Sequence, residues 1–248
     1  MPGGVFMTPR IDPASDNECR LAPACRRCSR HERCFALPEF PHLRYERSLW
    51  KSGLGCVGGI DEAGRGALAG PVAAAVVILP PDASLSRRVG AAQTLRGVRD
   101  SKQMTPLQRK AWAPRIQEIA LAWGVGFASA GEIDSLGILP ATKLAVTRAL
   151  DSLSLAPDYL ITDYLLLPNC PLPQTALVKG DRRSLTVAAA SVLAKTARDA
   201  LMREFDGEYP GYGYARHKGY GTPQHQEAIR RMGLCEIHRK SFAIHTVH

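Results

Sequence analysis

The sequence predicts an α/β fold, because short apolar runs alternate with helical patterns along most of the chain. A run such as Val72–Leu79 is short and uncharged, which is typical of a buried strand. The segment Ser184–Phe205 is rich in alanine, which favours a helix packed closely on a sheet. The chain has 248 residues, 45% of them hydrophobic, which suits one domain of about 200 residues plus a tail. We therefore expect an α/β domain over residues 48–248 and an extension over residues 1–47.

Five apolar runs are expected to form the strands of the sheet, and three of them end in acidic residues. The expected strands are Cys56–Asp61, Val72–Leu79, Trp123–Ala128, Tyr159–Asp163 and Ala176–Asp181.

The clearest helix start is Thr105–Gln108, where a threonine cap precedes a proline and, three residues after the cap, a glutamine. Pro114 lies inside this helix and predicts a kink or an interruption, and Leu107 and Ile116 are expected on its apolar face. Further helices are expected over Pro140–Leu153, Ser184–Phe205 and Thr222–Met232.

The net charge of +9, from 32 basic and 23 acidic residues, favours a polyanionic partner when it surrounds a carboxylate site. No apolar run is as long as a membrane span, and Met1–Ser15 has no signal-peptide core. We expect a cytoplasmic protein.

The extension carries four crowded cysteines and shows no sustained apolar period. Four thiolates are one way to bind a structural Zn²⁺ ion, although the pattern contains only one short cysteine pair. An iron–sulfur cluster is a second interpretation, and solvated or redox-active thiols on a disordered tail are a third. The four residues are Cys19, Cys25, Cys28 and Cys34.

Acidic residues recur where three predicted strands end. A single acid at a strand end is more often a cap or turn residue, but three recurrences favour a shared site, because ligands collect at strand ends in α/β sheets. Adjacent acids on one strand point to opposite faces, so we expect the first strand to stop or bulge there. Such paired acids are typical ligands of a hydrated divalent cation next to a phosphate. The acids are Asp61, Glu62, Asp163 and Asp181.

Several basic and glycine-rich stretches are candidates for phosphate contacts. Gly64 and Gly66 flank Arg65 and allow the backbone to come close to a ligand. The helix that begins near residue 184 offers free amides to a phosphate. Residues 209–222 interleave tyrosines with basic residues, which suits stacking on sugars or bases, or equally packing on the core. Residues 238–242 form a basic patch expected to add backbone contacts.

Together these stretches resemble the bacterial type 2 ribonucleases H, the ribonuclease HII family. The matches follow the family's order from about residue 55 to residue 242, and the first of them is highly specific. They are Gly59–Gly66, Asp100–Lys102, Lys179–Asp181, Ala188–Lys195, His217–Thr222 and His238–Phe242.

The resemblance implies a ribonuclease H-like fold, with a mixed sheet flanked by helices and a helical C-terminal region. It implies an endonuclease that acts on the RNA of RNA–DNA hybrids and on single ribonucleotides in duplex DNA. By motif position, Asp61, Glu62, Asp163 and Asp181 are the catalytic, metal-binding carboxylates. Substrate contacts fall to Gly64, Arg65 and Gly66 at the ribose 2′-hydroxyl, to Tyr220 at the junction sugar, and more weakly to Lys102, Ser191, Lys195 and Arg198.

Two positions depart from the family pattern. Ala67 stands where proline is usual, and Tyr164 follows Asp163 where glycine is usual. The second change bears on the assignment of Asp163 and on the fit of the substrate.

The chemistry implied is hydrolysis with two Mg²⁺ or Mn²⁺ ions by a monomer, which leaves 3′-hydroxyl and 5′-phosphate ends. A catalytically silent hybrid-binding protein is the alternative from another class, and it predicts erosion of the acids. The sister type 3 enzyme shares the chemistry but carries a long N-terminal substrate-binding domain, which the short extension does not resemble.

Overall fold

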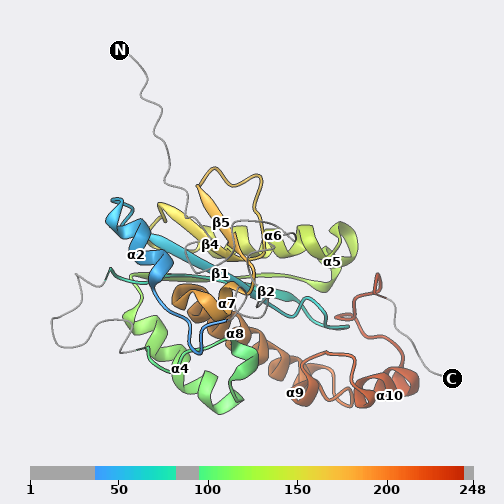
Figure 1. Ribbon diagram of the computed structural model, residues 1–248. Helices are drawn as coiled ribbons and strands as arrows, with labels where there is room; N and C mark the ends of the chain where they lie inside the picture. Colours follow the sequence, from blue (N-terminus) through green and yellow to red (C-terminus); the bar gives the residue numbers. More distant parts are fainter. Residues whose placement is uncertain (1–36, 82–94, 243–248) are drawn as a thin grey trace, which may run out of the picture.

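The computed structural model describes residues 37–81 and 95–242, and it is built around a five-stranded mixed sheet with the strand order β3-β2-β1-β4-β5 (Figure 1). β1 is antiparallel to β2, which is antiparallel to β3, whereas β1, β4 and β5 are parallel to one another. The strands are β1 (Val57–Ala63), β2 (Val72–Ile78), β3 (Ala122–Ala128), β4 (Tyr159–Asp163) and β5 (Gln174–Leu177).

Helices cover both faces of the sheet. α8 packs its alanine-rich face on one side of β1 and β2, and α6 packs on the other side of β2 and β3. The alternation along β2 shows this, because Ala75 and Val77 belong to the α8 side and Ala74 and Val76 to the α6 side. The helical elements described are α2 (Arg44–Lys51), η3 (Ser101–Gln103), α4 (Pro106–Ile119), α5 (Ala130–Leu136), α6 (Ile138–Asp151), α7 (Gly180–Arg183), α8 (Leu185–Glu208), α9 (Tyr214–His217) and α10 (Pro223–Met232).

The last two helices, α9 and α10, lie near the C-terminal end of α8 and form the helical region that the resemblance implies (Figure 1). None of the helices described is both long and apolar enough to cross a membrane.

Most predicted elements are present, with differences that have local causes. The capping box of α4 forms as predicted between Thr105 and Gln108, but the helix continues through Pro114 without an interruption. Leu107 is 80% exposed, so its predicted place on the apolar face is wrong, whereas Ile116 is buried. The fifth strand ends at Leu177, four residues before the predicted end.

Helix α2 spans the boundary predicted at residue 47. Tyr45 and Leu49 are each 1% exposed and pack on the sheet, so residues 44–47 contribute to the core of the domain. The cysteines of the extension, and with them the predicted Zn²⁺ site, lie outside the described residues.

Glu46 of α2 is fully buried at the N-terminus of α8. Its Oε1 accepts a hydrogen bond from Ser184 Oγ at 2.5 Å and another from the backbone N–H of Thr186 at 3.1 Å. Burial raises the pKa of this carboxyl, and the hydrogen bonds from Ser184 and Thr186 act in the opposite direction. Glu46 therefore joins the N-terminal helix to the longest helix of the domain.

We expect Glu46→Ala to lower the free energy of unfolding by about 2–3 kcal/mol, because two buried donors lose their acceptor. Glu39→Ala removes the same side chain from an exposed position of the same segment and should change it by less than about 0.5 kcal/mol. Denaturant unfolding of both variants measures the difference. Equal stabilities would contradict the buried role of Glu46.

Candidate active site

Four acidic side chains converge at one edge of the sheet. β1 and β4 run in parallel with Ile60 opposite Thr162, so Asp61 and Asp163 both follow the last paired residues of the two strands. Asp61 is 4% exposed, on the α8 side of the sheet, and the hydroxyl of Ser191 donates a hydrogen bond to it. The parallel pairing thus explains how acids about a hundred residues apart in sequence reach one place.

The predicted stop or bulge at the first acidic pair does not occur. β1 continues in register with β2 as far as Ala63, opposite Ala73. Its pairing with β4 ends at Ile60, however, so beyond this residue that side of β1 is open. Glu62 lines the cleft at this open edge, and its charge interacts with Asp163.

Asp181 comes from a helix and not from a strand end, as the sequence had suggested. It lies in the short helix α7, which begins after Lys179 turns through a left-handed backbone conformation (φ 56°). The N–H of Gly180 donates to Asp163 Oδ1 at 2.7 Å and so fixes the turn against β4.

Burial and mutual repulsion raise the pKa of each of these carboxyls. For Asp61 burial is the main cause, followed by the charge of Glu62, and its pKa lies well above the usual range. Burial and then the charge of Asp163 raise the pKa of Asp181 to about 7. Burial also raises the pKa of Asp163 and of Glu62, while hydrogen bonds from Gly180 and Arg65, respectively, act in the opposite direction. The positive charges near these four carboxyls are therefore too few to keep their pKa values in the usual range.

Two cations partly offset these acids. Arg65 Nη1 donates to Glu62 Oε1 at 2.9 Å. Burial lowers the pKa of Lys102, but the carboxylates around it, Asp61 foremost, shift it above its usual value. Both line a cleft of about 320 Å³ whose other walls are Ala63, Gly64, Gly66, Ser101, Lys195 and Tyr220.

Gly64 begins the wall of the cleft and leaves no room for a side chain. Its φ is +92°, and a Cβ atom there would lie 2.0 Å from Arg198 Nε. Gly66 is exposed, and a Cβ atom there would meet nothing within 4 Å. The two glycines therefore have different physical roles.

We expect Gly64→Ala to destabilise the fold by about 2 kcal/mol or more, because the new methyl group must displace a buried guanidinium and strain the backbone. Gly66→Ala is expected to leave thermal stability unchanged and to weaken hybrid cleavage, because its methyl group projects where a substrate backbone would approach. Melting curves and cleavage rates of the two variants separate these effects. Equal melting temperatures for the two variants would contradict the account of Gly64.

Two buried arginines hold the loop between β1 and β2. Arg198 donates to the carbonyls of Pro71 (2.8 Å), Ala69 (3.1 Å) and Lys218 (2.9 Å). Arg239 donates to three further carbonyls, those of Gly64 (2.7 Å), Arg65 (2.8 Å) and Gly70 (2.9 Å). Both residues are 0% exposed, so neither is the exposed phosphate contact that the sequence suggested.

Tyr220 also lines the cleft, and the carbonyl of Gly219 before it accepts from the N–H groups of Leu68 (2.8 Å) and Ala69 (3.2 Å) on this loop. The guanidinium of Arg198 lies 5.4 Å from the centre of its ring, and Lys195 Nζ lies 5.2 Å from it. Lys195 also forms an ion pair with Asp199, at 2.7 Å. Ser191, by contrast, is 2% exposed and forms a hydrogen bond with Asp61, so it does not face the open cleft.

Other predicted contacts do not reach the cleft. The first amides of α8 are already used, because Leu185 N–H donates to the carbonyl of His42 and Thr186 N–H to Glu46. Within the tyrosine-rich stretch, Tyr212 and Tyr214 are buried and stacked, with ring centres 5.4 Å apart. Tyr212 and Tyr214 therefore pack on the core, which is the second of the two interpretations of this stretch. Of the tyrosines in residues 209–222, only Tyr220 lines the cleft.

Asp100 is a carboxyl of the site that the sequence reasoning missed. It is 8% exposed, caps η3 by accepting from Lys102 N–H at 2.9 Å, and forms a hydrogen bond with the side chain of Asp181. The sequence drew attention to the segment Asp100–Lys102 for its lysine, and the acid in the same segment was the available signal.

Tyr164, the departure from the family pattern, has a left-handed backbone (φ 53°), which glycine adopts without strain. Its side chain is 76% exposed directly after Asp163. Asp163 still ends β4 despite the tyrosine that follows it. Tyr164 adds an exposed aromatic ring beside Asp163, where the family usually has glycine.

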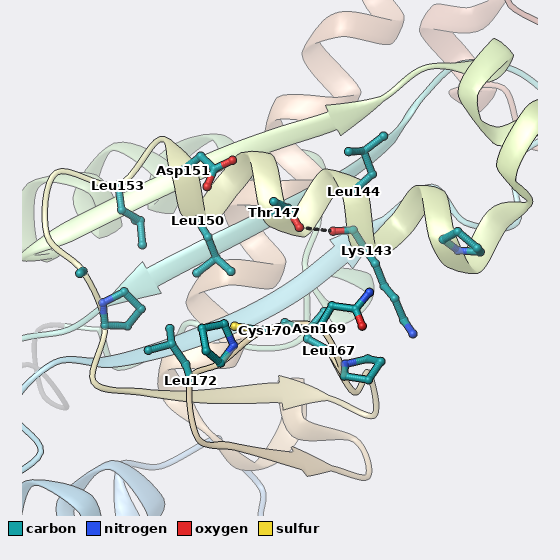
Figure 2. Close-up of a pocket in the computed structure, with 15 residues that line it drawn as sticks. Lys143, Leu144, Thr147, Leu150, Asp151, Leu153, Leu167, Asn169, Cys170 and Leu172 are labelled. Carbon is teal, nitrogen blue, oxygen red and sulfur yellow. Dashed lines mark hydrogen bonds between the residues drawn. The ribbon is translucent and has the colours of Figure 1, made fainter.

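A larger apolar pocket of about 600 Å³ lies elsewhere, between α6 and the segment that joins β4 to β5 (Figure 2). Leu150 of α6 points toward Leu172 across it, and Asp151 is the one carboxylate among its lining residues. It has no cluster of acids and is separate from the acidic cleft.

The chain is similar to known proteins over most of its length. The family model for ribonuclease HII matches residues 58–245. The chain is 51% identical over 201 residues to a ribonuclease HII of Geobacillus kaustophilus, covering 81% of this chain and 73% of the relative. It is 52% identical over 198 residues to a ribonuclease HII of Thermus thermophilus, covering 80% of this chain and 91% of the relative. The crystal structure of ribonuclease H2 from Pyrococcus horikoshii OT3 superposes with a TM-score of 0.63 at 26% identity, covering 76% of this chain and 94% of that one.

The mixed sheet, its flanking helices and the acidic cleft at the ends of its parallel strands define a nuclease with a ribonuclease H-like fold, as predicted. The chain belongs to the ribonuclease HII family, and it is a ribonuclease H, an endonuclease that hydrolyses phosphodiester bonds.

Proposed function

We propose that this ribonuclease H binds divalent cations through Asp61, Glu62, Asp163 and Asp181, and that it cuts both RNA–DNA hybrids and DNA that contains a single ribonucleotide. The observation that carries the proposal is the convergence of these acids beside the loop of Gly64, Arg65 and Gly66. The acids proposed to bind the cations then lie next to the loop proposed to contact the ribose 2′-hydroxyl.

The acids suit Mg²⁺ or Mn²⁺ by their chemistry, because hard divalent cations prefer carboxylate oxygens. Repulsion between the acids raises their pKa values, and a bound cation would offset that repulsion. Among residues 37–81 and 95–242, no three Asp, Glu, His or Cys side chains already stand in the arrangement of an assembled metal site. Assembly then requires movements of the acids, and Glu62 can contribute Oε2, because its bond to Arg65 uses Oε1.

Bound cations would supply an activated water and would neutralise the charge that develops on the leaving oxygen. The chain's own residues orient the reacting strand. Lys102 and Arg65 are charged and line the cleft, where they can hold phosphate oxygens next to the acids. The backbone at Gly64 and Gly66 approaches a ribose closely enough to contact its 2′-hydroxyl, which distinguishes RNA from DNA.

Selection of a single ribonucleotide is assigned to Tyr220. Its ring lines the same cleft as Arg65, where it can pack on the deoxyribose that follows the ribonucleotide. We further propose that the protein acts as a monomer.

Cleavage of a labelled RNA–DNA hybrid with Mg²⁺, Mn²⁺ or EDTA tests the metal requirement. We expect cutting with either ion and none with EDTA, and calorimetric titration should show that Mn²⁺ binds the wild type more tightly than Asp181→Asn. Cutting that persists in EDTA would contradict the proposal. Binding of the hybrid without any cleavage would instead favour the silent-binder alternative.

A further inference from the structure

Three buried histidines form a cluster that contacts the backbone at Tyr220. The proposed chemistry does not use these histidines. His217, His225 and His238 are 8%, 0% and 1% exposed. The rings of His217 and His225 stack with centres 4.4 Å apart, and His225 Nε2 lies 3.2 Å from His238 Nε2. Three imidazoles in such close contact cannot all carry a charge.

The hydrogen-bond partners fix which nitrogen of each ring carries the proton. The N–H of Cys235 points at His238 Nδ1 (2.9 Å), so this nitrogen accepts and Nε2 holds the proton. His238 Nε2–H then donates to His225 Nε2, which leaves the proton of His225 on Nδ1. That Nδ1–H donates to the carbonyl of Tyr220 at 3.0 Å.

His217 is fixed in the same manner from the other side of Tyr220. Its Nε2 lies 2.8 Å from the carbonyl of Tyr212 and must donate to it. Its bare Nδ1 accepts from the N–H of Gly219 at 3.2 Å. Each ring thus has one donor and one acceptor, and all are matched while the three rings are neutral.

The backbone at Tyr220 needs such support because glycine precedes and follows it. Gly219 has a φ of +78°, and neither glycine offers a side chain to anchor the loop. The two stacked imidazoles hold the peptide groups on either side of the tyrosine. His238 in turn belongs to the segment that pairs with Ala69, on the loop between β1 and β2.

We propose that His217, His225 and His238 are positioning residues for Tyr220: a relay of neutral imidazoles fixes its backbone and thereby sets where its ring meets the substrate. This inference rests on the proposed role of Tyr220. Burial lowers the pKa of all three histidines, that of His225 to about 4, which agrees with neutral rings.

Two substitutions of His225 separate the relay from simple packing. In His225→Asn, the amide nitrogen can take the place of Nδ1 and still donate to the Tyr220 carbonyl. In His225→Gln, the amide oxygen can take the place of Nε2 and accept from His238, but the carbonyl of Tyr220 loses the imidazole donor and keeps only the N–H of Thr222, at 2.8 Å. Both variants remove the ring, so a purely structural role predicts the same effect for both.

We expect His225→Gln to raise KM for a duplex with one ribonucleotide about tenfold, with kcat on a long hybrid within about twofold of the wild type. His225→Asn should keep KM within about threefold of the wild type. Equal KM values for the two variants would overturn the relay.

Nitrogen-15 NMR of the full-length protein reads the ring protons without substrate or metal. We expect His225 to be protonated at Nδ1, and His217 and His238 at Nε2, near neutral pH. A proton on Nε2 of His225, or a charged ring, would overturn the proposal. If these tautomers are found while Tyr220→Ala leaves KM unchanged, the relay stands and the proposed substrate contact of Tyr220 falls.

Discussion

Asp61→Asn is expected to reduce hybrid cleavage by about 10³-fold or more, because the variant loses one of the two most buried carboxylates proposed to bind the cations. Hybrid affinity should stay within about threefold, since the basic and glycine-lined walls are unchanged. Thermal stability should be equal or higher, because burial and neighbouring acids disfavour the charged form of Asp61 and an amide avoids that cost. Single-turnover rates, binding titrations and melting curves measure the three quantities.

Asp151→Asn is the matched control for this change. Asp151 lines the apolar pocket at the end of α6 (Figure 2), and its substitution removes the same charge outside the cleft. Its cleavage rate should stay within about twofold of the wild type. Full activity of Asp61→Asn, or an equal loss in both variants, would contradict the assignment of Asp61.

Arg239→Leu is expected to lower the free energy of unfolding by about 3–5 kcal/mol, the largest effect on stability that we expect. Three carbonyls, those of Gly64, Arg65 and Gly70, would lose the hydrogen bonds that a fully buried guanidinium donates to them. Arg239→Lys should recover only part of the loss, because one ammonium group cannot reproduce the planar fork of a guanidinium. Cleavage should fall in both variants, because the same carbonyls position the loop that lines the cleft.

The control for this prediction is Lys240→Leu, the same type of change at the next residue. Lys240 is exposed, and its hydrogen bond to Asp134 uses the backbone N–H. Denaturant unfolding should place this variant within about 0.5 kcal/mol of the wild type. A loss in Arg239→Leu no larger than that of the control would contradict the proposed support of the loop.

The sequence was sufficient for the elements whose pattern is local. The strand Tyr159–Asp163 and the capping box at Thr105 and Gln108 depend on adjacent residues, and both form as predicted. The order of motifs also led to the family, which the comparisons confirm. The position of Asp163 was predictable despite Tyr164, because the strand before it is a continuous apolar run.

The features that the sequence did not predict depend on partners distant along the chain. The first amides of α8 looked free because Glu46, which accepts from Thr186, lies 140 residues away. Arg239 looked like an exposed cation because its carbonyl partners are about 170 residues away. Charged residues with such partners can be fully buried, and composition alone does not distinguish them from a solvated basic patch.

The most direct test of the central claim is the cleavage of a labelled DNA duplex that contains one ribonucleotide, with Mg²⁺ present. The same duplex with deoxyribose at that position is the control. We expect a single cut on the 5′ side of the ribonucleotide, which leaves 3′-hydroxyl and 5′-phosphate ends, and no cut in the control. Cutting of both duplexes, or of neither when a long hybrid is cut, would contradict the reading of the 2′-hydroxyl in the cleft formed by Arg65 and Tyr220.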